Sequence, residues 1–331
     1  MAPIQFSEEI EYLEIHPTNM CIFKCPWCTY LQFGSRQGQS LNMDSINKAL
    51  KLNPEFILIC GGGDPTTYNV NNNNLSDLVN HINTVQNNPN ILIGTHGAFD
   101  VSNKHLFSTL VNVPRIGISL DASYEATRTG RDRNAMKRAI DNTTGIVKQR
   151  SKVNKRTYIS FTFTKDNWMK LFEIAWLLFN QINSYKFKFN YTMIADDNCP
   201  HDPYYPSRLQ PSDRINWYLF LDLLDLLNPD FSCFIKEHTR LSKIPEDKNP
   251  AFGVKRCGMV NKYVLAAADG YYYPCCVMAA KQTCRLGQIS ATTPRDLKNR
   301  REDFYYNKTP AICREGCRVR DFTLMGSKAW V

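Results

Sequence analysis

The sequence predicts an α/β protein: a partial (β/α)6 TIM-like barrel followed by a small cysteine-rich C-terminal domain made of a β-hairpin and a helix. Short β-like runs alternate with amphipathic helical segments through the first two thirds of the chain, which is typical of parallel β/α units. Six such units in roughly 200 residues fall short of a closed eight-unit barrel. Cysteines cluster near both ends of the chain. We therefore expect a barrel at 1–200, a connecting helix and linker at 201–256, and a cysteine-rich domain at 257–331.

The predicted strands are short runs rich in β-branched and aromatic residues, at 9–16, 55–60, 90–96, 115–121, 156–164 and 186–194. The predicted helices that separate them lie at 44–52, 74–85, 104–110, 135–149 and 168–182. This alternation of strands and helices predicts parallel strands joined by right-handed crossovers. In such barrels the chemistry lies at the C-terminal ends of the strands.

The segment after the sixth strand is predicted to contain one further helix, at 212–227, with Ser212 as its N-cap and Pro229 just beyond its end. Residues 196–211, rich in proline and aromatic residues, are predicted to form a long loop at the domain junction. The asparagine-rich segment 68–75 is predicted to be a surface loop.

Composition narrows the class of protein. The chain has 331 residues, 43% of them hydrophobic, and a formal net charge of +9 that is scattered along it. It shows no secretory signal and no apolar run near the ~20 residues of a membrane helix, so we expect a cytoplasmic protein without a membrane partner. The charge accompanies no zinc finger or RNA-binding aromatic motif, which disfavours a nucleic-acid partner.

Twelve cysteines without a secretory signal favour thiolate ligation of metal over disulfides. Three of them, Cys21, Cys25 and Cys28, lie in the stretch CIFKCPWC, directly after the first predicted strand. Four thiolates would saturate an iron–sulfur cube or a tetrahedral zinc ion, whereas three leave one metal position open. The alternative is a structural zinc ion with His16 as the fourth ligand.

The spacing C-x3-C-x2-C after a first strand, with Trp27 before the last cysteine, resembles the radical S-adenosylmethionine (SAM) enzymes. The resemblance implies that Cys21, Cys25 and Cys28 hold a [4Fe–4S] cluster. In that family the open iron chelates the amino and carboxylate groups of SAM. An electron from the cluster then cleaves SAM to a 5′-deoxyadenosyl radical, which abstracts a hydrogen atom from the substrate.

A second motif, CGGGDPTT, follows the second strand and resembles the GGEP element of the same family, with aspartate in place of the usual glutamate. The residues aligned with that element, and implied to contact SAM, are Gly62, Gly63, Asp64 and Pro65. Glycines allow the backbone to approach the methionine amino group closely.

Two more strand ends resemble SAM-facing positions of the family. The third strand ends in GTHG, where Thr95 begins the counterpart of a Thr-Asn-Gly element, and the fourth ends in ISLDAS, where Ser119 and Asp121 match polar residues that face SAM. The resemblance further implies that Arg128 reaches the SAM carboxylate. A core or cap role is the alternative for Ser119.

The C-terminal cysteines follow the pattern C-x12-G-x4-C, at Cys257, Gly270 and Cys275, which predicts a hairpin with ligands on both arms. Cys313 and Cys317 follow with the spacing C-x3-C. Four cysteines from a hairpin and a loop also suit structural zinc, which remains the alternative.

The C-terminal pattern resembles the auxiliary-cluster extension called SPASM, or its shorter twitch form. Because the full seven-cysteine array is absent, the resemblance implies one auxiliary [4Fe–4S] cluster, bound by Cys257, Cys275, Cys313 and Cys317. Either Cys276 or Cys284 could replace one of these four ligands.

The resemblance implies a radical SAM oxidoreductase, because an auxiliary cluster can accept the electron left on an oxidised substrate. The expected substrate is a ribosomally synthesised precursor peptide that is cross-linked, dehydrogenated or cleaved, with flavodoxin or ferredoxin as electron donor. The alternative is a dehydrogenase or epimerase of a small polar natural-product intermediate such as an aminoglycoside. Epimerisation would need a thiol hydrogen donor, for which Cys199 and Cys233 are the candidates. A zinc-stabilised nucleic-acid-binding protein is the remote alternative.

Overall fold

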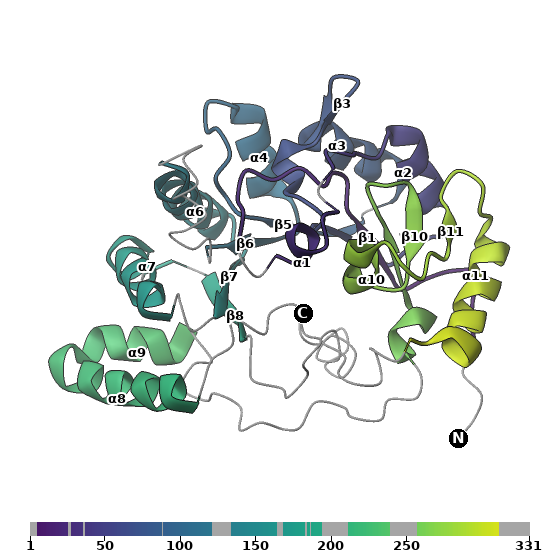
Figure 1. Cartoon of the computed structure of the whole chain (residues 1–331). Helices are drawn as coiled ribbons and strands as arrows, with labels where there is room; N and C mark the ends of the chain where they lie inside the picture. Colours follow the sequence, from purple (N-terminus) through teal and green to yellow (C-terminus); the bar gives the residue numbers. More distant parts are fainter. Residues whose placement is uncertain are drawn as a thin grey trace.

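The computed structural model describes residues 5–25, 28–35, 37–87, 89–120, 134–163, 168–182, 184–185, 187–193, 211–238 and 257–310. Its main sheet has the strand order β11-β10-β9-β1-β2-β5-β6-β7-β8 (Figure 1). Six of these strands are parallel neighbours in chain order: β1 Tyr12–Ile15, β2 Phe56–Ile59, β5 Asn90–Thr95, β6 Arg115–Ser119, β7 Thr157–Phe163 and β8 Phe187–Met193. The predicted α/β fold and all six predicted strands are confirmed.

The helices between these strands lie in an arc along one face of the sheet (Figure 1). They are α2 Met43–Leu50, α3 Leu75–Val85, α4 Lys104–Asn112, α6 Ala135–Lys152 and α7 Trp168–Ile182. Each of them overlaps a predicted helix. At the start of α3, Asn74 is the cap of the helix rather than its first residue, because its side chain accepts hydrogen bonds from the backbone of Ser76 and Asp77.

Alternating burial along the strands separates the two faces of the sheet. In β2 the side chains of Ile57 and Ile59 are at most 1% exposed and pack with Ile46 of α2 and Leu78 of α3. The residues between them along β2, β5 and β6 are only half-buried. Because side chains of a strand point alternately to opposite faces, these half-buried positions lie on the face that the helices leave open.

The asparagine-rich segment is the first difference from the prediction. In place of a plain loop it forms an antiparallel hairpin of two short strands, β3 Asn69–Val70 and β4 Asn73–Asn74. Asn71 and Asn72 at its tip have φ of 51° and 64°. A two-residue hairpin turn with both residues in the left-handed region suits asparagine, which tolerates this conformation better than most residues.

The helix after the sixth strand is the second difference. Helix α8 Pro211–Leu227 begins at a proline, so Ser212 is its second residue and not its N-cap. Proline is favoured in the first turn of a helix because the N–H groups there have no acceptor within the helix, so proline loses no hydrogen bond. Helix α9 Pro229–His238 then begins at the predicted stop. Residues 196–210 of the predicted junction loop lie outside the described residues. No helix within the described ranges is long and apolar enough to cross a lipid bilayer.

The C-terminal cysteine-rich segment extends the same sheet. Its strands β9 Tyr263–Ala266 and β10 Tyr271–Tyr273 form the predicted hairpin, with Gly270 at a φ of 83° in the turn. Strand β9 also pairs in parallel with β1, and β11 Gly287–Gln288 pairs with β10. The other elements of this segment are η4 Gly258–Asn261, α10 Cys276–Lys281, α11 Pro294–Asp303 and η5 Phe304–Lys308. The hairpin therefore lies beside the first strand of the barrel.

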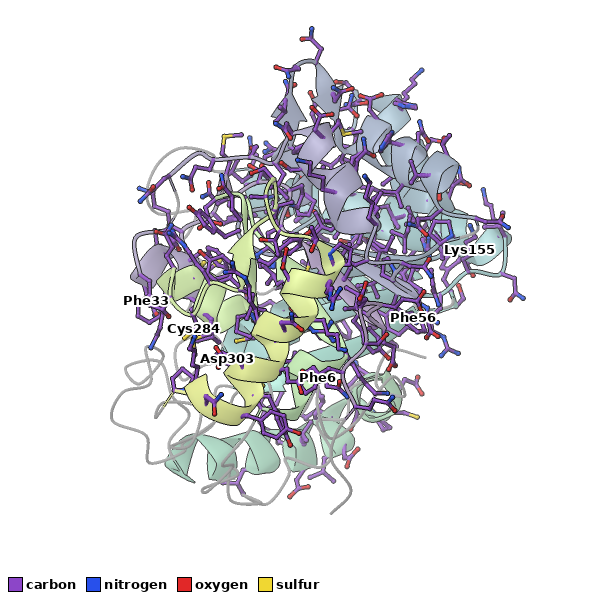
Figure 2. All side chains as sticks on the ribbon, turned by 90° about the vertical axis from the view of Figure 1, so that its right-hand side faces the viewer. Phe6, Phe33, Phe56, Lys155, Cys284 and Asp303 are labelled. Carbon is purple, nitrogen blue, oxygen red and sulfur yellow. The ribbon has the colours of Figure 1, made fainter. Side chains whose placement is uncertain are left out.

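Helix α11 joins this segment to the N-terminal residues through one buried arginine. The Arg301 side chain has no exposed surface, and it donates hydrogen bonds to the carbonyl oxygens of Val260 (2.8 Å), Ser7 (3.0 Å) and Asn261. Its guanidinium carbon lies 5.8 Å from the centre of the Phe6 ring, and Figure 2 labels Phe6 beside α11. One side chain thus connects three segments that are far apart in sequence.

Candidate functional site

The three-cysteine loop lies directly after β1, at the C-terminal edge of the parallel strands. Cys21, Cys25 and Cys28 are all half-buried, and Cys21 and Cys25 pack against the main core. The amide of Cys28 donates to the carbonyl of Cys25 (2.9 Å), and Cys28 precedes the short helix α1 Thr29–Gln32. The structure thus holds the three thiols in one short folded loop.

The spacing of these thiols differs from that of a single-ion site. Among the described residues, the one group of three possible metal ligands whose donor atoms all lie within 4.8 Å of one another is Glu14, His16 and Cys60. No such group forms from Cys21, Cys25, Cys28 and His16, all of which are described. Ligands of one zinc ion must nearly touch, whereas cysteines that bind different irons of a cube stand farther apart. The structure therefore does not bring His16 and the three thiols together as the ligands of one ion.

The glycine-rich loop after β2 packs tightly against the residues that lead into the cysteine loop. The amide of Gly63 donates to the carbonyl of Thr18 (2.8 Å), and the amide of Asp64 donates to the carbonyl of Met20 (2.7 Å). A Cβ atom added at Gly63 would lie 1.9 Å from the Met20 carbonyl oxygen. Glycine is required here because the chain's own backbone occupies the space of a side chain. Contact of this loop with SAM stays a prediction.

We expect Gly63→Ala to lower the free energy of unfolding by about 1–3 kcal/mol, because both clashing groups are held by backbone bonds and neither can rotate away. Urea titration measures this loss. Gly117→Ala is the matched control, since a Cβ atom there meets nothing within 4 Å. Equal free energies of unfolding for the two variants would contradict the prediction and show that the loop can move to accommodate a side chain at position 63.

The Asp64 carboxylate connects the loop after β2 to the end of β5. It is 3% exposed and accepts hydrogen bonds from the backbone amide of Thr66 (2.9 Å), the hydroxyl of Thr95 (3.0 and 3.1 Å) and the backbone amide of His96 (2.7 Å). The Thr66 hydroxyl donates to it as well. Two residues predicted to contact SAM, Asp64 and Thr95, are thus brought together. Pro65 follows in the first turn of η1 Pro65–Thr67.

The next strand end carries the third predicted position. Ser119 closes β6, and its hydroxyl lies 2.9 Å from the hydroxyl of Ser160 on β7, on the half-buried side of both strands. Asp121 and Arg128 lie outside the described residues. The structure therefore places Ser119 at the same edge of the sheet as Asp64 and Thr95.

A cavity of about 290 Å³ opens next to these strand ends. Its walls combine the cysteine loop, the loop after β2, the end of β5 and two helices, and they include Ile22, Thr66, Thr67, His96, Leu106 and Arg138. This hollow, with an arginine on its wall, adjoins the loops that carry the predicted motifs.

One of the predicted auxiliary ligands, Cys275, packs around the same small apolar cluster as Tyr30, two residues after Cys28 of the N-terminal loop. Cys257 precedes η4 and Cys275 is the N-cap of α10. Burial raises the pKa of the Cys257 thiol, and hydrogen bonds from backbone amides partly oppose this rise. Cys313 and Cys317 lie outside the described residues.

The remaining cysteines are placed as follows. Cys276 begins α10, and Cys284 has a φ of 56°; both pack around the same apolar cluster as Tyr30. Burial, and after it the charge of Cys276, raises the pKa of Tyr30 well above its usual value. Cys233 is exposed on α9. Cys199 lies outside the described residues.

A polar group at the end of β1 was not predicted as a group, although His16 was named as an alternative zinc ligand. The Glu14 carboxylate lies 2.5 Å from the His16 ring, and the Cys60 thiol donates to it (3.4 Å). Burial alone would raise the pKa of Glu14, but the charge of His16 and hydrogen bonds lower it below its usual value. Burial, and then the charge of Glu14, raises the pKa of Cys60 well above its usual value. The local signal is a glutamate and a histidine two residues apart in the first predicted strand.

Comparisons with known proteins identify the fold. No protein-family model matches the sequence, and no curated protein matches it. Streptococcus suis SuiB with S-adenosylmethionine bound aligns with a TM-score of 0.54 and 13% identity over 93% of this chain. Native anSMEcpe with AdoMet and the Cp18Cys peptide bound aligns with a TM-score of 0.56 and 18% identity over 94% of this chain and 89% of that chain. The chain spans 66% of the SuiB chain's length. At these identities the likeness establishes the α/β fold.

Proposed function

We propose that this chain is a radical SAM enzyme whose cluster is bound by Cys21, Cys25 and Cys28. The observation that carries the proposal is the placement of this cysteine loop directly after β1, packed through Thr18 and Met20 against the loop of Gly63 after β2. Two adjacent loops at the C-terminal edge of parallel strands are where barrel enzymes bring their chemistry together. Two proteins of similar fold have been solved with S-adenosylmethionine bound, which supports the same ligand here.

The chain's residues have separate roles in this proposal. A [4Fe–4S] cluster with one open iron would bind SAM and supply the electron that cleaves it to methionine and a 5′-deoxyadenosyl radical. The Asp64 carboxylate holds the loop after β2 to the end of β5, because Thr95 and His96 both donate to it. Ser119 offers a hydroxyl at the same edge for a polar group of SAM.

We further propose a net oxidation of a peptide substrate. An auxiliary cluster on Cys257, Cys275, Cys313 and Cys317 would take the second electron after hydrogen abstraction, while a proton leaves the substrate, so that two electrons are removed in all. Cys275 and Tyr30, which follows the first cysteine loop, pack around the same apolar cluster, which supports electron transfer between the two regions. A fold relative binds a peptide together with AdoMet. A flavodoxin or ferredoxin would reduce the first cluster.

The deciding experiment uses the full chain, purified and reconstituted without oxygen. We expect about eight irons per chain from two clusters, and 5′-deoxyadenosine from SAM after reduction with dithionite. Zinc in place of iron would end the proposal. About four irons with one zinc ion bound by four sulfurs would make the C-terminal cysteines structural and remove the support for net oxidation. A short peptide encoded beside the gene, tested for loss of two hydrogens by mass spectrometry, separates the peptide class from small polar substrates.

A further inference from the structure

Three different donor groups converge between the first two strands, apart from the cysteine loop. Glu14 in β1 and His16 directly after it point to the same side of the sheet, because they are two residues apart and the pairing with β9 continues through the His16 amide, which donates to the Ala266 carbonyl (2.9 Å). Cys60 directly follows β2, whose last residue pairs with the last residue of β1 (Ile15 with Ile59). A carboxylate oxygen, an imidazole nitrogen and a thiol sulfur therefore all lie within 4.8 Å of one another.

The atoms of His16 and Glu14 that point away from the centre of this group are hydrogen-bonded, as is usual for metal ligands. The Nδ1 atom of His16 lies 2.6 Å from the Tyr30 hydroxyl, which leaves Nε2 directed at Glu14 and the centre of the group. The Tyr263 hydroxyl donates to Oε2 of Glu14, which leaves Oε1 directed inward. Such outer hydrogen bonds fix the orientation of ligating histidines and carboxylates.

The ring of His16 packs against a residue without a side chain. A Cβ atom added at Gly61 would lie 2.2 Å from Nε2, 2.6 Å from Cε1 and 2.8 Å from Cδ2 of His16, so the imidazole ring packs directly against the Gly61 backbone. With a φ of 73°, Gly61 also has a backbone conformation that other residues rarely adopt. Glycine is therefore required at position 61 for the His16 ring to lie where it meets Glu14.

We propose that Glu14, His16 and Cys60 bind one divalent transition-metal ion, Zn²⁺ by the chemistry of the three donors. Mixed oxygen, nitrogen and sulfur ligands suit zinc, and three protein ligands leave a fourth position for water or an external ligand. A buried cation would also offset the negative charge that Glu14 places beside the Cys60 thiol. This site is separate from the cysteine loop, and it does not rest on the proposed function.

X-ray absorption at the zinc edge tests the site directly in the reconstituted full chain, after incubation with a small excess of Zn²⁺ and desalting. The expected result is about one zinc ion per chain with one sulfur at about 2.3 Å and nitrogen or oxygen ligands at about 2.0–2.1 Å. Zinc held by the clustered cysteines would instead show three or four sulfurs. A shell of three or four sulfurs, or no bound zinc, overturns the proposal. Glu14, His16 and Cys60 would then be only a hydrogen-bonded network.

Two near-isosteric variants locate the ion. Glu14→Gln and Cys60→Ser should each lower the bound zinc at least about tenfold. Cys233→Ser, an exposed thiol on α9, should leave it unchanged. Zinc retained by both ligand variants would place the ion elsewhere and overturn the proposal. If a variant folds poorly, the sulfur count of the wild-type spectrum still decides. Iron content and 5′-deoxyadenosine are measured on the same samples, so that failure of the proposed function is seen separately.

Discussion

Replacing Cys21, Cys25 and Cys28 together with alanine should lower the iron content from about eight to about four atoms per chain and abolish the formation of 5′-deoxyadenosine from SAM. The three thiols lie in one short loop, and no single-ion group forms among them within the described part of the chain. Their removal takes away every protein ligand of the proposed SAM-binding cluster. The remaining iron would belong to the auxiliary cluster, which has no open position for SAM. Iron analysis and chromatography of the reaction products measure both changes.

The control for this prediction is Cys233→Ser, which removes one exposed thiol from α9 and should keep both the iron and the SAM cleavage. Circular dichroism of the triple variant shows whether the barrel is still folded. A folded triple variant that keeps about eight irons would contradict the assignment of the loop. One that has lost all its iron would mean that the C-terminal cysteines hold no cluster of their own.

Arg301→Met should lower the free energy of unfolding by about 3–5 kcal/mol. The guanidinium group has no exposed surface, and its donors reach backbone carbonyls of η4 and of the N-terminal segment. Methionine fills much of the same volume but leaves these carbonyls without their donor. Burial lowers the pKa of Arg301 to about 10, so the side chain is still charged at neutral pH and its hydrogen bonds are charge-assisted. Urea unfolding at neutral pH measures the loss.

Arg300→Met provides the matched comparison, since it makes the same chemical change one residue earlier on the exposed side of α11. We expect it to alter the free energy of unfolding by no more than about 0.5 kcal/mol. Similar losses in the two variants would mean that the burial of Arg301 contributes nothing specific. A loss confined to Arg301 would show that the C-terminal segment depends on this contact with the N-terminal residues.

The order of strands and helices in the barrel could be read from the sequence because its signals are local. A short apolar run rich in β-branched residues, such as Phe56–Ile59, indicates a strand, and the helix at Trp168–Ile182 shows its own periodicity. The errors were local too. Helix α8 begins at Pro211 in place of a Ser212 cap, and Asn71 and Asn72 form a hairpin turn where only low complexity was visible.

The candidate site also has parts that the sequence predicts and parts that only the folded structure shows. The spacing of Cys21, Cys25 and Cys28, and the glycines after β2, are visible in the sequence as motifs. Their contact is not visible, because Gly63 meets Met20, 43 residues earlier, only when the two loops lie side by side. The partners of Asp64 on β5 are likewise set by the pairing of β2 with β5.

The sequence by itself determined the α/β class, the order of the barrel strands and the position of the three-cysteine loop, because periodicity and motif spacing are properties of short segments. The tertiary structure alone decided that β9 pairs with β1, that Tyr30 and Cys275 pack around one cluster, and that Glu14, His16 and Cys60 form one buried group. Each of these contacts joins residues from separate strands or loops. Such contacts leave no periodic trace in the chain, because they depend on which strands lie next to one another in the folded sheet.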